Sequence, residues 1–308
     1  MSAVTFRNVN KSFGSKQALQ NLSFKVPSGS ICGLVGANGA GKTTTMGVIS
    51  GLLKADSGEI NLLGSGPFSV ERHRGRIGLM PQDSSPSLHS SILASLKYFA
   101  ELQGYTRSEA AVAAERALVA VGLGDRQRAK FLSLSHGMRR RMIIAQAILG
   151  QPDLILLDEP TSGLDPDVVV LIRNQILSLK GKSTVIVSSH ILAELETICD
   201  HVIFLENGSC MRDDSLGAIM NQSIRVAYTL EKKPDLQLLQ KQFPEAKLSY
   251  QKNQFLVEKT NHRTVESLNQ EMLPLLLDQK LGIQEVRSGD SLEEAWLEAR
   301  QERSSPKA

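Results

Sequence analysis

A glycine-rich turn between a strand-like run and a helix-like run leaves this chain few possible folds. The apolar run Ile31–Val35 leads into Gly36-Ala37-Asn38-Gly39-Ala40-Gly41-Lys42-Thr43, which fits the pattern G-x-x-x-x-G-K-[ST], and a helix-like stretch follows. Glycines let the backbone curl around a polyphosphate, and the positive end of the next helix attracts it. The segment predicts a nucleotide site in which Lys42 reaches the β- and γ-phosphates and the Thr43 hydroxyl ligates Mg²⁺.

Strand-like and helix-like segments alternate around this turn. The other runs typical of buried strands are Ile77–Met80, Leu154–Leu157 and Thr184–Val187. The helix-like stretches are Thr43–Leu53, Ile92–Leu102, Ser108–Val121, Met138–Leu149 and Asp167–Leu179. Such alternation predicts an α/β core around a mostly parallel sheet. Two earlier strand-like segments and one later Asn-Gly hairpin turn complete this part: Val4–Val9, Leu22–Val26 and Glu206–Ser209.

The distribution of glycine indicates a boundary near residue 220. Of the 24 glycines, all but Gly282 and Gly289 precede residue 221. The tail contains, in order, the strand-like Ile224–Leu230 and Gln254–Glu258, the helix-like Val265–Leu281, the strand-like Ile283–Val286 and a last helix opened by the capping box Ser291-Leu292-Glu293-Glu294. We therefore expect a domain over residues 1–220 and a small C-terminal α/β extension over 221–308.

Composition excludes several classes of protein. With 41% hydrophobic and 22% charged residues, the chain is close to the soluble globular average, which excludes wholesale disorder. A net charge of +3 gives no indication of a nucleic-acid partner, and we interpret Arg139-Arg140-Arg141 as a solvated helix face. No apolar run approaches the roughly 18 residues of a membrane span, and no signal-peptide pattern is visible. Three cysteines without metal-ligand spacing fit a reducing compartment.

Two carboxylates follow the apolar run Leu154–Leu157. Asp158 and Glu159 come directly after it. A buried parallel strand delivers its last residues to the carboxyl edge of the sheet, where the glycine-rich turn also lies. We therefore predict that Asp158 holds Mg²⁺ through its water shell and that Glu159 polarises the attacking water. A base of this kind needs hydrogen-bond reach of the water more than an unusual pKa.

Five more short segments stand in order around these two motifs. They are Phe13, Gln82 after Ile77–Met80, Leu134-Ser135-His136-Gly137-Met138, Ser162-Gly163-Leu164-Asp165, and His190 after Thr184–Val187. Together the seven motifs resemble the ATPase subunit of ABC transporters over about residues 1–220. The third segment is similar to the family's signature loop, LSGGQ. The segment differs from LSGGQ at His136 and Met138 and matches it at Ser135 and Gly137.

The resemblance implies a fold and a role for each motif. The fold is a P-loop NTPase core with an antiparallel β subdomain and a helical subdomain over about residues 83–150. Phe13 would stack on adenine, and Gly36–Thr44, including Thr44, would hold the phosphates. Gln82 would be the Q-loop residue that contacts Mg²⁺ and acts in catalysis, and His190 would be the catalytic switch histidine. Ser135 and Gly137 would bind the nucleotide of a second copy, so that a homodimer, or a pair with another ATPase subunit, encloses two ATP molecules.

A membrane partner also follows from the resemblance. Because the chain has no spanning segment, we expect a separate permease, with the ATPase bound peripherally at the cytoplasmic face of the inner membrane. Gln82 and the helical segment after it would pass the ATP-driven motion to that permease. The tail segment Ser291–Leu297 resembles the ending of exporter ATPases of the daunorubicin-resistance type, which export drugs, haem and polymers. This similarity favours an exporter.

Two alternatives remain open at this stage. One is a non-transport ABC ATPase that acts on ribosomes or DNA. Translation factors of that class usually carry two cassettes in one chain and repair proteins carry long coiled coils, whereas this chain has one cassette and no heptad run between its motifs. The other is a regulatory nucleotide-binding module with little turnover. Glu159 argues against it, because binding alone needs no base.

Overall fold

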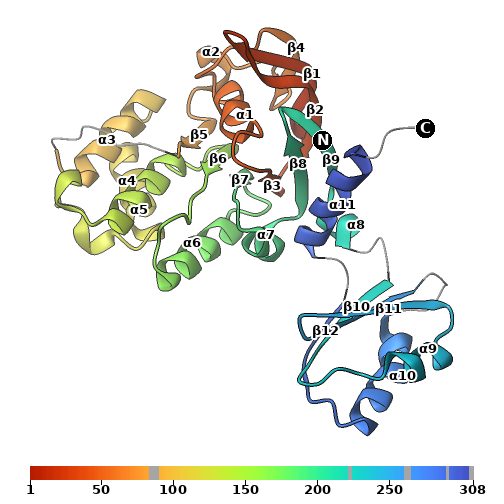
Figure 1. Ribbon diagram of the computed structural model, residues 1–308. Coiled ribbons are helices and arrows are strands. Elements are labelled where there is room, and N and C mark those ends of the chain that lie inside the picture. Colours follow the sequence, from red (N-terminus) through yellow and green to blue (C-terminus); the bar gives the residue numbers. More distant parts are fainter. Residues whose placement is uncertain (83–89, 221–223, 260–264, 289–290, 305–308) are drawn as a thin grey trace. The chain divides into compact units, whose positions relative to one another are not determined.

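The computed structural model describes residues 1–82, 90–220, 224–259, 265–288 and 291–304 (Figure 1). These residues form two compact units, Met1–Ser215 and Leu216–Glu302. Sheets and helices make up both units, so the predicted α/β class is confirmed. Within the described ranges, every helix is too short or too polar to span a bilayer.

The first unit is built on a six-stranded sheet. Its strands lie in the order β5 (Ile77–Met80), β6 (Leu154–Asp158), β7 (Thr184–Ser188), β3 (Ile31–Val35), β8 (His201–Glu206) and β9 (Ser209–Ser215). The first five run parallel, and β9 pairs antiparallel with β8 across the Asn207-Gly208 turn. Since β3, β6 and β7 are buried throughout, they are nearly continuous apolar runs. All four strands predicted from these runs are present, although β5 alternates half-buried and buried residues.

A second sheet, which is antiparallel, shares its core with the first. Its strands lie in the order β2 (Lys16–Pro27), β1 (Ser2–Phe13) and β4 (Ser57–Leu62). One apolar cluster joins this sheet, helix α1 (Lys42–Ile49) and one face of the six-stranded sheet. In it the rings of Phe6 and Phe24 stack with their centroids 4.7 Å apart. The cluster fixes α1, and hence the glycine-rich turn before it, against the sheets.

The opposite face of the six-stranded sheet carries helices α6 (Pro166–Ser178) and α7 (Leu192–Ile198), which lie beside each other (Figure 1). A Cβ on Gly33 of β3 would lie 3.3 Å from the Leu195 side chain of α7. Pro166 begins α6, a position where the missing N–H costs nothing. The sequence predicted α6 but not α7, which has only seven residues.

Three helices form the segment between Gln82 and β6. They are α3 (Ile92–Gln103), α4 (Arg107–Ala120) and α5 (His136–Ala147), and they contact one another. Ser91 and Ser135 cap α3 and α5, and Thr106 with Glu109 forms a capping box on α4. Of the helical subdomain predicted at about 83–150, residues 83–89 lie outside the described residues. The short helices of the unit are α2 (Val70–His73), η1 (Gly124–Arg126) and η2 (Phe131–Ser133).

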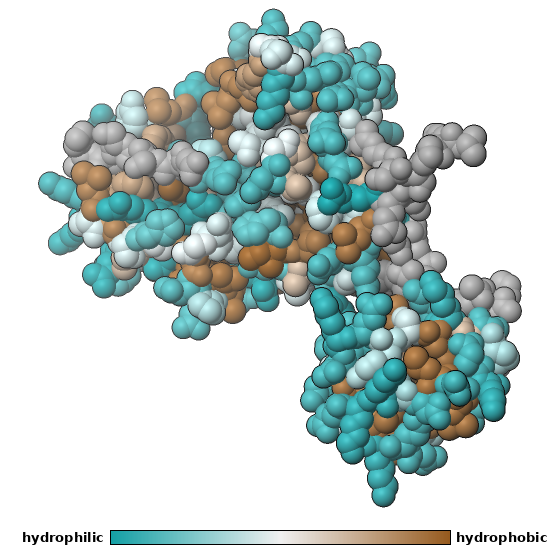
Figure 2. Space-filling model, viewed as in Figure 1, coloured by the Kyte–Doolittle hydropathy of each residue, from teal (hydrophilic) through white to brown (hydrophobic). Residues whose placement is uncertain are grey.

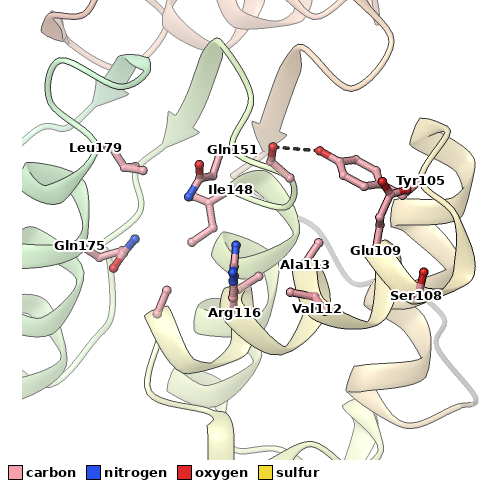
Figure 3. A pocket seen from close by; sticks show the side chains of 13 residues that line it. Tyr105, Ser108, Glu109, Val112, Ala113, Arg116, Ile148, Gln151, Gln175 and Leu179 are labelled. Atoms are coloured by element: carbon pink, nitrogen blue, oxygen red, sulfur yellow. Dashed lines mark hydrogen bonds between the residues drawn. The ribbon is translucent and has the colours of Figure 1, made fainter.

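A largely apolar hollow of about 460 Å³ lies beside α4 (Figure 3). Its lining comes from Tyr105, α4, the segment that follows α5, and the C-terminal part of α6 with the residue after it. The Tyr105 hydroxyl, which lines it, donates to the carbonyl of Gly150 at 3.0 Å. It shares no lining residue with the cavity at the glycine-rich turn, which is described below.

The second unit has its own sheet and core. It begins with α8 (Leu216–Met220), and α11 (Leu292–Ser304) follows its last strand. Between them the order is β10 (Ile224–Leu230), α9 (Leu236–Gln242), β11 (Ala246–Gln251), β12 (Gln254–Lys259), α10 (Val265–Asp278) and β13 (Ile283–Ser288). The sheet is antiparallel with the order β11-β12-β10-β13, so this βαββαβ unit is ferredoxin-like. The expected capping box forms, since Ser291 and Glu294 each accept from the other's N–H.

Candidate active site

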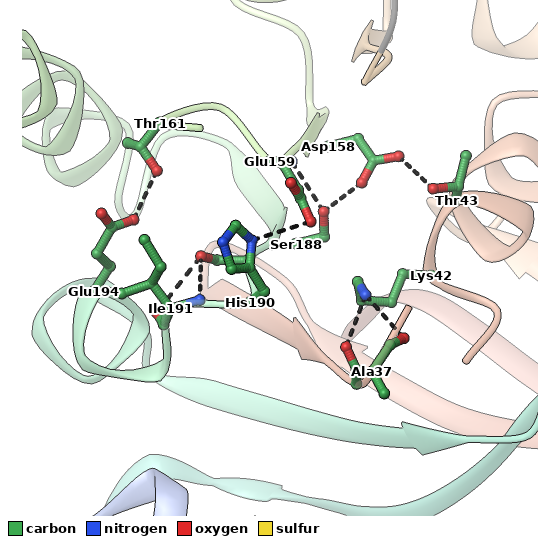
Figure 4. Close-up of polar contacts among 12 residues, drawn as sticks. Ala37, Lys42, Thr43, Asp158, Glu159, Thr161, Ser188, His190, Ile191 and Glu194 are labelled. Carbon is green, nitrogen blue, oxygen red and sulfur yellow. Dashed lines mark hydrogen bonds and ion pairs between the residues drawn. The ribbon is translucent and has the colours of Figure 1, made fainter. Parts of the chain in front are cut away.

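The glycine-rich turn joins β3 to α1 and surrounds the Lys42 side chain. Lys42 is 7% exposed, and its Nζ donates to the carbonyls of Gly36 at 2.7 Å and Ala37 at 3.2 Å (Figure 4). Gly36 has no room for a side chain, because a Cβ there would lie 2.5 Å from the Leu205 carbonyl oxygen. Gly41 caps α1 with φ 108°, a conformation that favours glycine. The turn therefore presents backbone N–H groups and an ammonium group at the start of a helix.

Burial lowers the pKa of the Lys42 ammonium from its ordinary value. The carboxylates of Glu159 and Asp158 act in the opposite direction and raise it. An anionic ligand beside the turn would favour the charged form further. Lys42 is thus an ammonium group held in a partly desolvated place, where its attraction for phosphate is stronger than in water.

Asp158 ends β6 facing the first turn of α1. The Thr43 hydroxyl donates to Asp158 Oδ2 at 2.8 Å, and the Ser188 hydroxyl donates to Asp158 Oδ1 (Figure 4). A hydroxyl and a carboxylate are oxygen ligands of the kind that Mg²⁺ prefers. Among the residues that the structure describes, no group of three or more His, Cys, Asp or Glu gathers as a metal site. Thr43 and Asp158 together could therefore supply two oxygen ligands to such an ion.

Glu159 has a strained main chain that neighbouring groups hold in place. Its φ is 50°, in the left-handed region that few residues other than glycine adopt. Its N–H donates to the Ser188 carbonyl at 3.1 Å and to the Ser188 hydroxyl at 3.0 Å. His190 Nδ1 lies 3.3 Å from Glu159 Oε1 (Figure 4). The end of β7 thus fixes both the main chain and the carboxylate of Glu159.

A polar cavity of about 410 Å³ brings most of the predicted residues together. It is lined by Phe13, Lys16, Ala18, Asn38, Gly39, Gly41, Lys42, Thr43, Thr44, Gln82, Asp158 and Glu159. Phe13 is 49% exposed at its margin, with Lys11 Nζ 5.4 Å from the ring centroid. His190 reaches this group through Glu159. The cavity thus offers an aromatic face, a cradle of N–H groups, an ammonium and two carboxylates.

Ser135 and Gly137 stand apart from this cavity. They lie at the start of α5, where the Ser135 hydroxyl accepts from the Met138 N–H at 3.3 Å. Neither is among the residues that line the cavity, and Ser135 is exposed. A Cβ on Gly137 would lie 3.6 Å from the Leu164 side chain. The start of α5 is therefore exposed at Ser135 and separate from the cavity of its own chain.

The interpretation of Arg139-Arg140-Arg141 as a solvated helix face is wrong. Arg139 donates to the Leu132 carbonyl at 2.7 Å, and Arg141 donates to the carbonyls of Val121 and Gly122. Arg140 donates to carbonyls at the phosphate site, including that of Glu159. The three arginines thus donate to main-chain carbonyls in four separate segments: η2, the segment after β5, the end of β6 and the turn after α4.

Sequence reasoning also missed Ser188 and Lys16. Ser188 is fully buried between Asp158 and Glu159, and Lys16 lines the cavity. A signal for Ser188 existed. It is the polar residue that ends an apolar strand, in register with Asp158 of the neighbouring strand. Its role depends on the strand order, which sequence patterns do not show. For Lys16 the sequence gives no comparable signal.

Fold and site together define a P-loop nucleotide hydrolase, and comparisons with known proteins give its family. The ABC transporter family model matches residues 19–162. The Nod factor export ATP-binding protein I of Burkholderia lata is 36% identical over 227 residues, which cover 73% of this chain and 74% of that protein. An uncharacterized ABC transporter ATP-binding protein of Methanocaldococcus jannaschii is 31% identical over 226 residues, covering 73% and 82%.

Solved structures agree with these relatives. An ATP-binding subunit of an ABC transporter matches with a TM-score of 0.64 and 26% identity over 71% of this chain and 92% of that one. The ADP conformation of an ATP-binding cassette matches with a TM-score of 0.61 and 25% identity over 71% and 94%. This chain belongs to the ABC transporter family, and it is an ATPase that energises a transporter, as its sequence predicts. The relatives' names favour this function over the two alternatives.

Proposed function

We propose that this chain is the ATP-hydrolysing subunit of an exporter, bound peripherally at the cytoplasmic face of the inner membrane to a separate permease. The observation that carries the ATP site is the single cavity shared by Phe13, the glycine-rich turn, Asp158 and Glu159. The direction of transport is supported by the relative named for Nod factor export and by the tail segment Ser291–Leu297.

We assign a separate role in ATP binding or hydrolysis to each group at the cavity. The N–H groups of Gly36–Thr44 and the Lys42 ammonium bind the phosphates. Glu159 accepts a proton from the attacking water, and His190 holds the Glu159 carboxylate in place. Thr43 and Asp158, with Gln82, would hold Mg²⁺, which neutralises phosphate charge when bound. Phe13 offers its exposed ring to the adenine.

We place the nucleotide between two copies of the chain. The exposed start of α5, with Ser135 and Gly137, lies outside the cavity of its own chain. The positive end of a helix attracts phosphate, so α5 of one copy would bind the γ-phosphate that the other copy holds. ATP would then join the two copies, and hydrolysis would release them.

This arrangement predicts ATP-dependent dimers. The Glu159→Gln variant should double its mass in light scattering when ATP and Mg²⁺ are added, because it binds ATP and hydrolyses it only very slowly. Adding Ser135→Arg should keep it monomeric, since a large side chain then fills the contact with the γ-phosphate. Ser108→Arg, on an exposed turn of α4, is the matched control and should still dimerise. Equal dimerisation of the Ser135→Arg and Ser108→Arg forms would refute the arrangement.

A permease partner is the second expectation. Large apolar side chains are exposed on the helical segment: Tyr98, Leu102, Val112 and Val119. Figure 2 shows hydrophobic residues exposed among hydrophilic ones on this face of the molecule. We expect the full chain to co-purify in detergent with the multi-span membrane protein encoded beside its gene. That complex should hydrolyse ATP faster than the isolated chain. Stimulation by ribosomes or DNA, with no effect of the membrane protein, would favour the alternative function.

A further inference from the structure

Arg140 links three segments that meet at the phosphate site. It lies on α5, and its guanidinium donates through Nη1 to the Gln82 carbonyl at 2.7 Å. Through Nη2 it donates to the Asp158 carbonyl at 3.3 Å and to the Glu159 carbonyl. One side chain of the helical segment therefore bonds to the main chain after β5 and to the main chain at the end of β6.

The main chain of Glu159 is held from both sides. Ser188 of β7 binds its N–H, and Arg140 of α5 binds its carbonyl. A left-handed conformation in a residue other than glycine persists only where its surroundings impose it. Of these two supports, Ser188 belongs to the sheet, whereas Arg140 belongs to a helix outside the sheet. The position of the Glu159 carboxylate therefore depends on the position of α5.

We propose that Arg140 is a positioning residue for hydrolysis. It acts through Glu159: by fixing the Glu159 main chain it keeps the carboxylate within reach of the attacking water. It also ties that position to Gln82, so that a displacement of the segment after β5 moves the base. This inference rests on the proposed role of Glu159 as the base, and it adds a residue outside the cavity lining to the hydrolytic machinery.

The chemistry of this contact requires arginine. A planar guanidinium presents five N–H groups in a fixed fork and can serve several carbonyls at once. A lysine ammonium could reach one of these carbonyls but not bridge Gln82 and Glu159 with the same geometry. Glutamine has two donors on one nitrogen and carries no charge. We therefore expect a graded series in which Lys retains more function than Gln.

The neighbouring arginine provides a matched control. Arg141 is on the same helix and also donates to two main-chain carbonyls, those of Val121 at 3.1 Å and Gly122 at 2.9 Å. These acceptors follow α4 and lie outside the cavity lining. Arg141→Gln thus removes the same kind of hydrogen bonds from α5 without touching Glu159. A purely structural role for Arg140 would make both variants behave alike.

The test measures steady-state and single-turnover ATP hydrolysis by the full chain. We expect Arg140→Gln to lower kcat by about 10- to 100-fold, as a misplacement of about 1 Å can do, while KM for ATP changes less than about twofold. Arg140→Lys should lower kcat by a smaller factor than Arg140→Gln does. Arg141→Gln should keep kcat within about twofold of the wild-type value. In the Glu159→Gln background, Arg140→Gln should have almost no further effect on the single-turnover rate, because both changes act on one base.

Each possible result either supports or contradicts the proposed role of Arg140. The inference fails if Arg140→Gln hydrolyses ATP like Arg141→Gln, or if its loss is as large in the Glu159→Gln background as in the wild type. If thermal unfolding shows that Arg140→Gln does not fold, Arg140→Lys is compared with Arg141→Gln in its place. An inactive wild-type chain, or one whose turnover survives Glu159→Gln, would instead contradict the proposed function, so the two failures are distinguishable.

Discussion

The Glu159→Gln variant will bind ATP but lose nearly all turnover. Glutamine keeps the size of the side chain, and the Glu159 main chain is held by Ser188 and Arg140 in either case. The amide cannot accept a proton from water, so we expect kcat to fall by about 10²- to 10⁴-fold, the usual contribution of a positioned base. Turnover is followed by phosphate release and binding by a fluorescent ATP analogue.

The control for this change is Glu115→Gln, which removes a carboxylate from an exposed position on α4. It should hydrolyse ATP at the wild-type rate. If Glu159→Gln keeps more than about a tenth of the wild-type kcat, a group other than Glu159 acts as the base. Loss of binding as well as turnover would show that the residue holds the nucleotide rather than the water.

Lys42→Ala is expected to abolish measurable ATP binding at ordinary concentrations. The buried ammonium now bonds to the Gly36 and Ala37 carbonyls, and ATP would replace these neutral acceptors by phosphate oxygens. Removing one partner of a desolvated, charge-assisted contact should weaken binding about 100-fold or more. The variant also leaves the carboxylates of Asp158 and Glu159 without the nearby positive charge. Isothermal titration with ATP and Mg²⁺ measures the change.

Lys182→Ala is the matched control, since Lys182 is an exposed lysine between α6 and β7. It should bind ATP as the wild type does. A Lys42→Ala protein that keeps both affinity and turnover would refute the phosphate site. Circular dichroism before titration separates loss of binding from loss of fold.

The elements that could be predicted from the sequence are those whose residue pattern is compatible with only one kind of secondary structure and environment. β3, β6 and β7 are buried on both faces, so their apolar runs end sharply at turns or carboxylates. The glycine-rich turn was recognisable because Gly36 and Gly41 have geometric reasons to be glycine. In the second unit, two of the three predicted strands, β10 and β12, alternate buried and half-buried residues.

The elements that were missed are short or largely exposed. β4 buries only Leu62, and its sequence Ser-Gly-Glu-Ile-Asn-Leu lacks a clear alternation. α9 has seven residues, of which only Leu239 is buried, and β11 has one buried residue, Ala246. Such segments gain their structure from the neighbours against which they pack, so the local pattern carries little information about them.

At the site, the missed residues act through contacts distant in sequence. Ser188 meets Asp158 only because β7 lies next to β6, and Arg140 meets Gln82 and Glu159 only because α5 packs against both segments. A run of three arginines on a helix is typical of a solvated face, so the sequence pattern itself favoured the wrong interpretation. Only the fold shows which carbonyls need donors.

A nascent chain cannot complete the phosphate pocket until synthesis has passed Ser188. The reason is that β7 lies between β3, which leads into the glycine-rich turn, and β6, which supplies Asp158 and Glu159. Early fragments therefore contain the turn without its opposite wall, so we expect ATP to bind tightly only to the finished unit. Binding then stabilises that unit by mass action, so depletion of ATP would expose newly made protein to proteolysis.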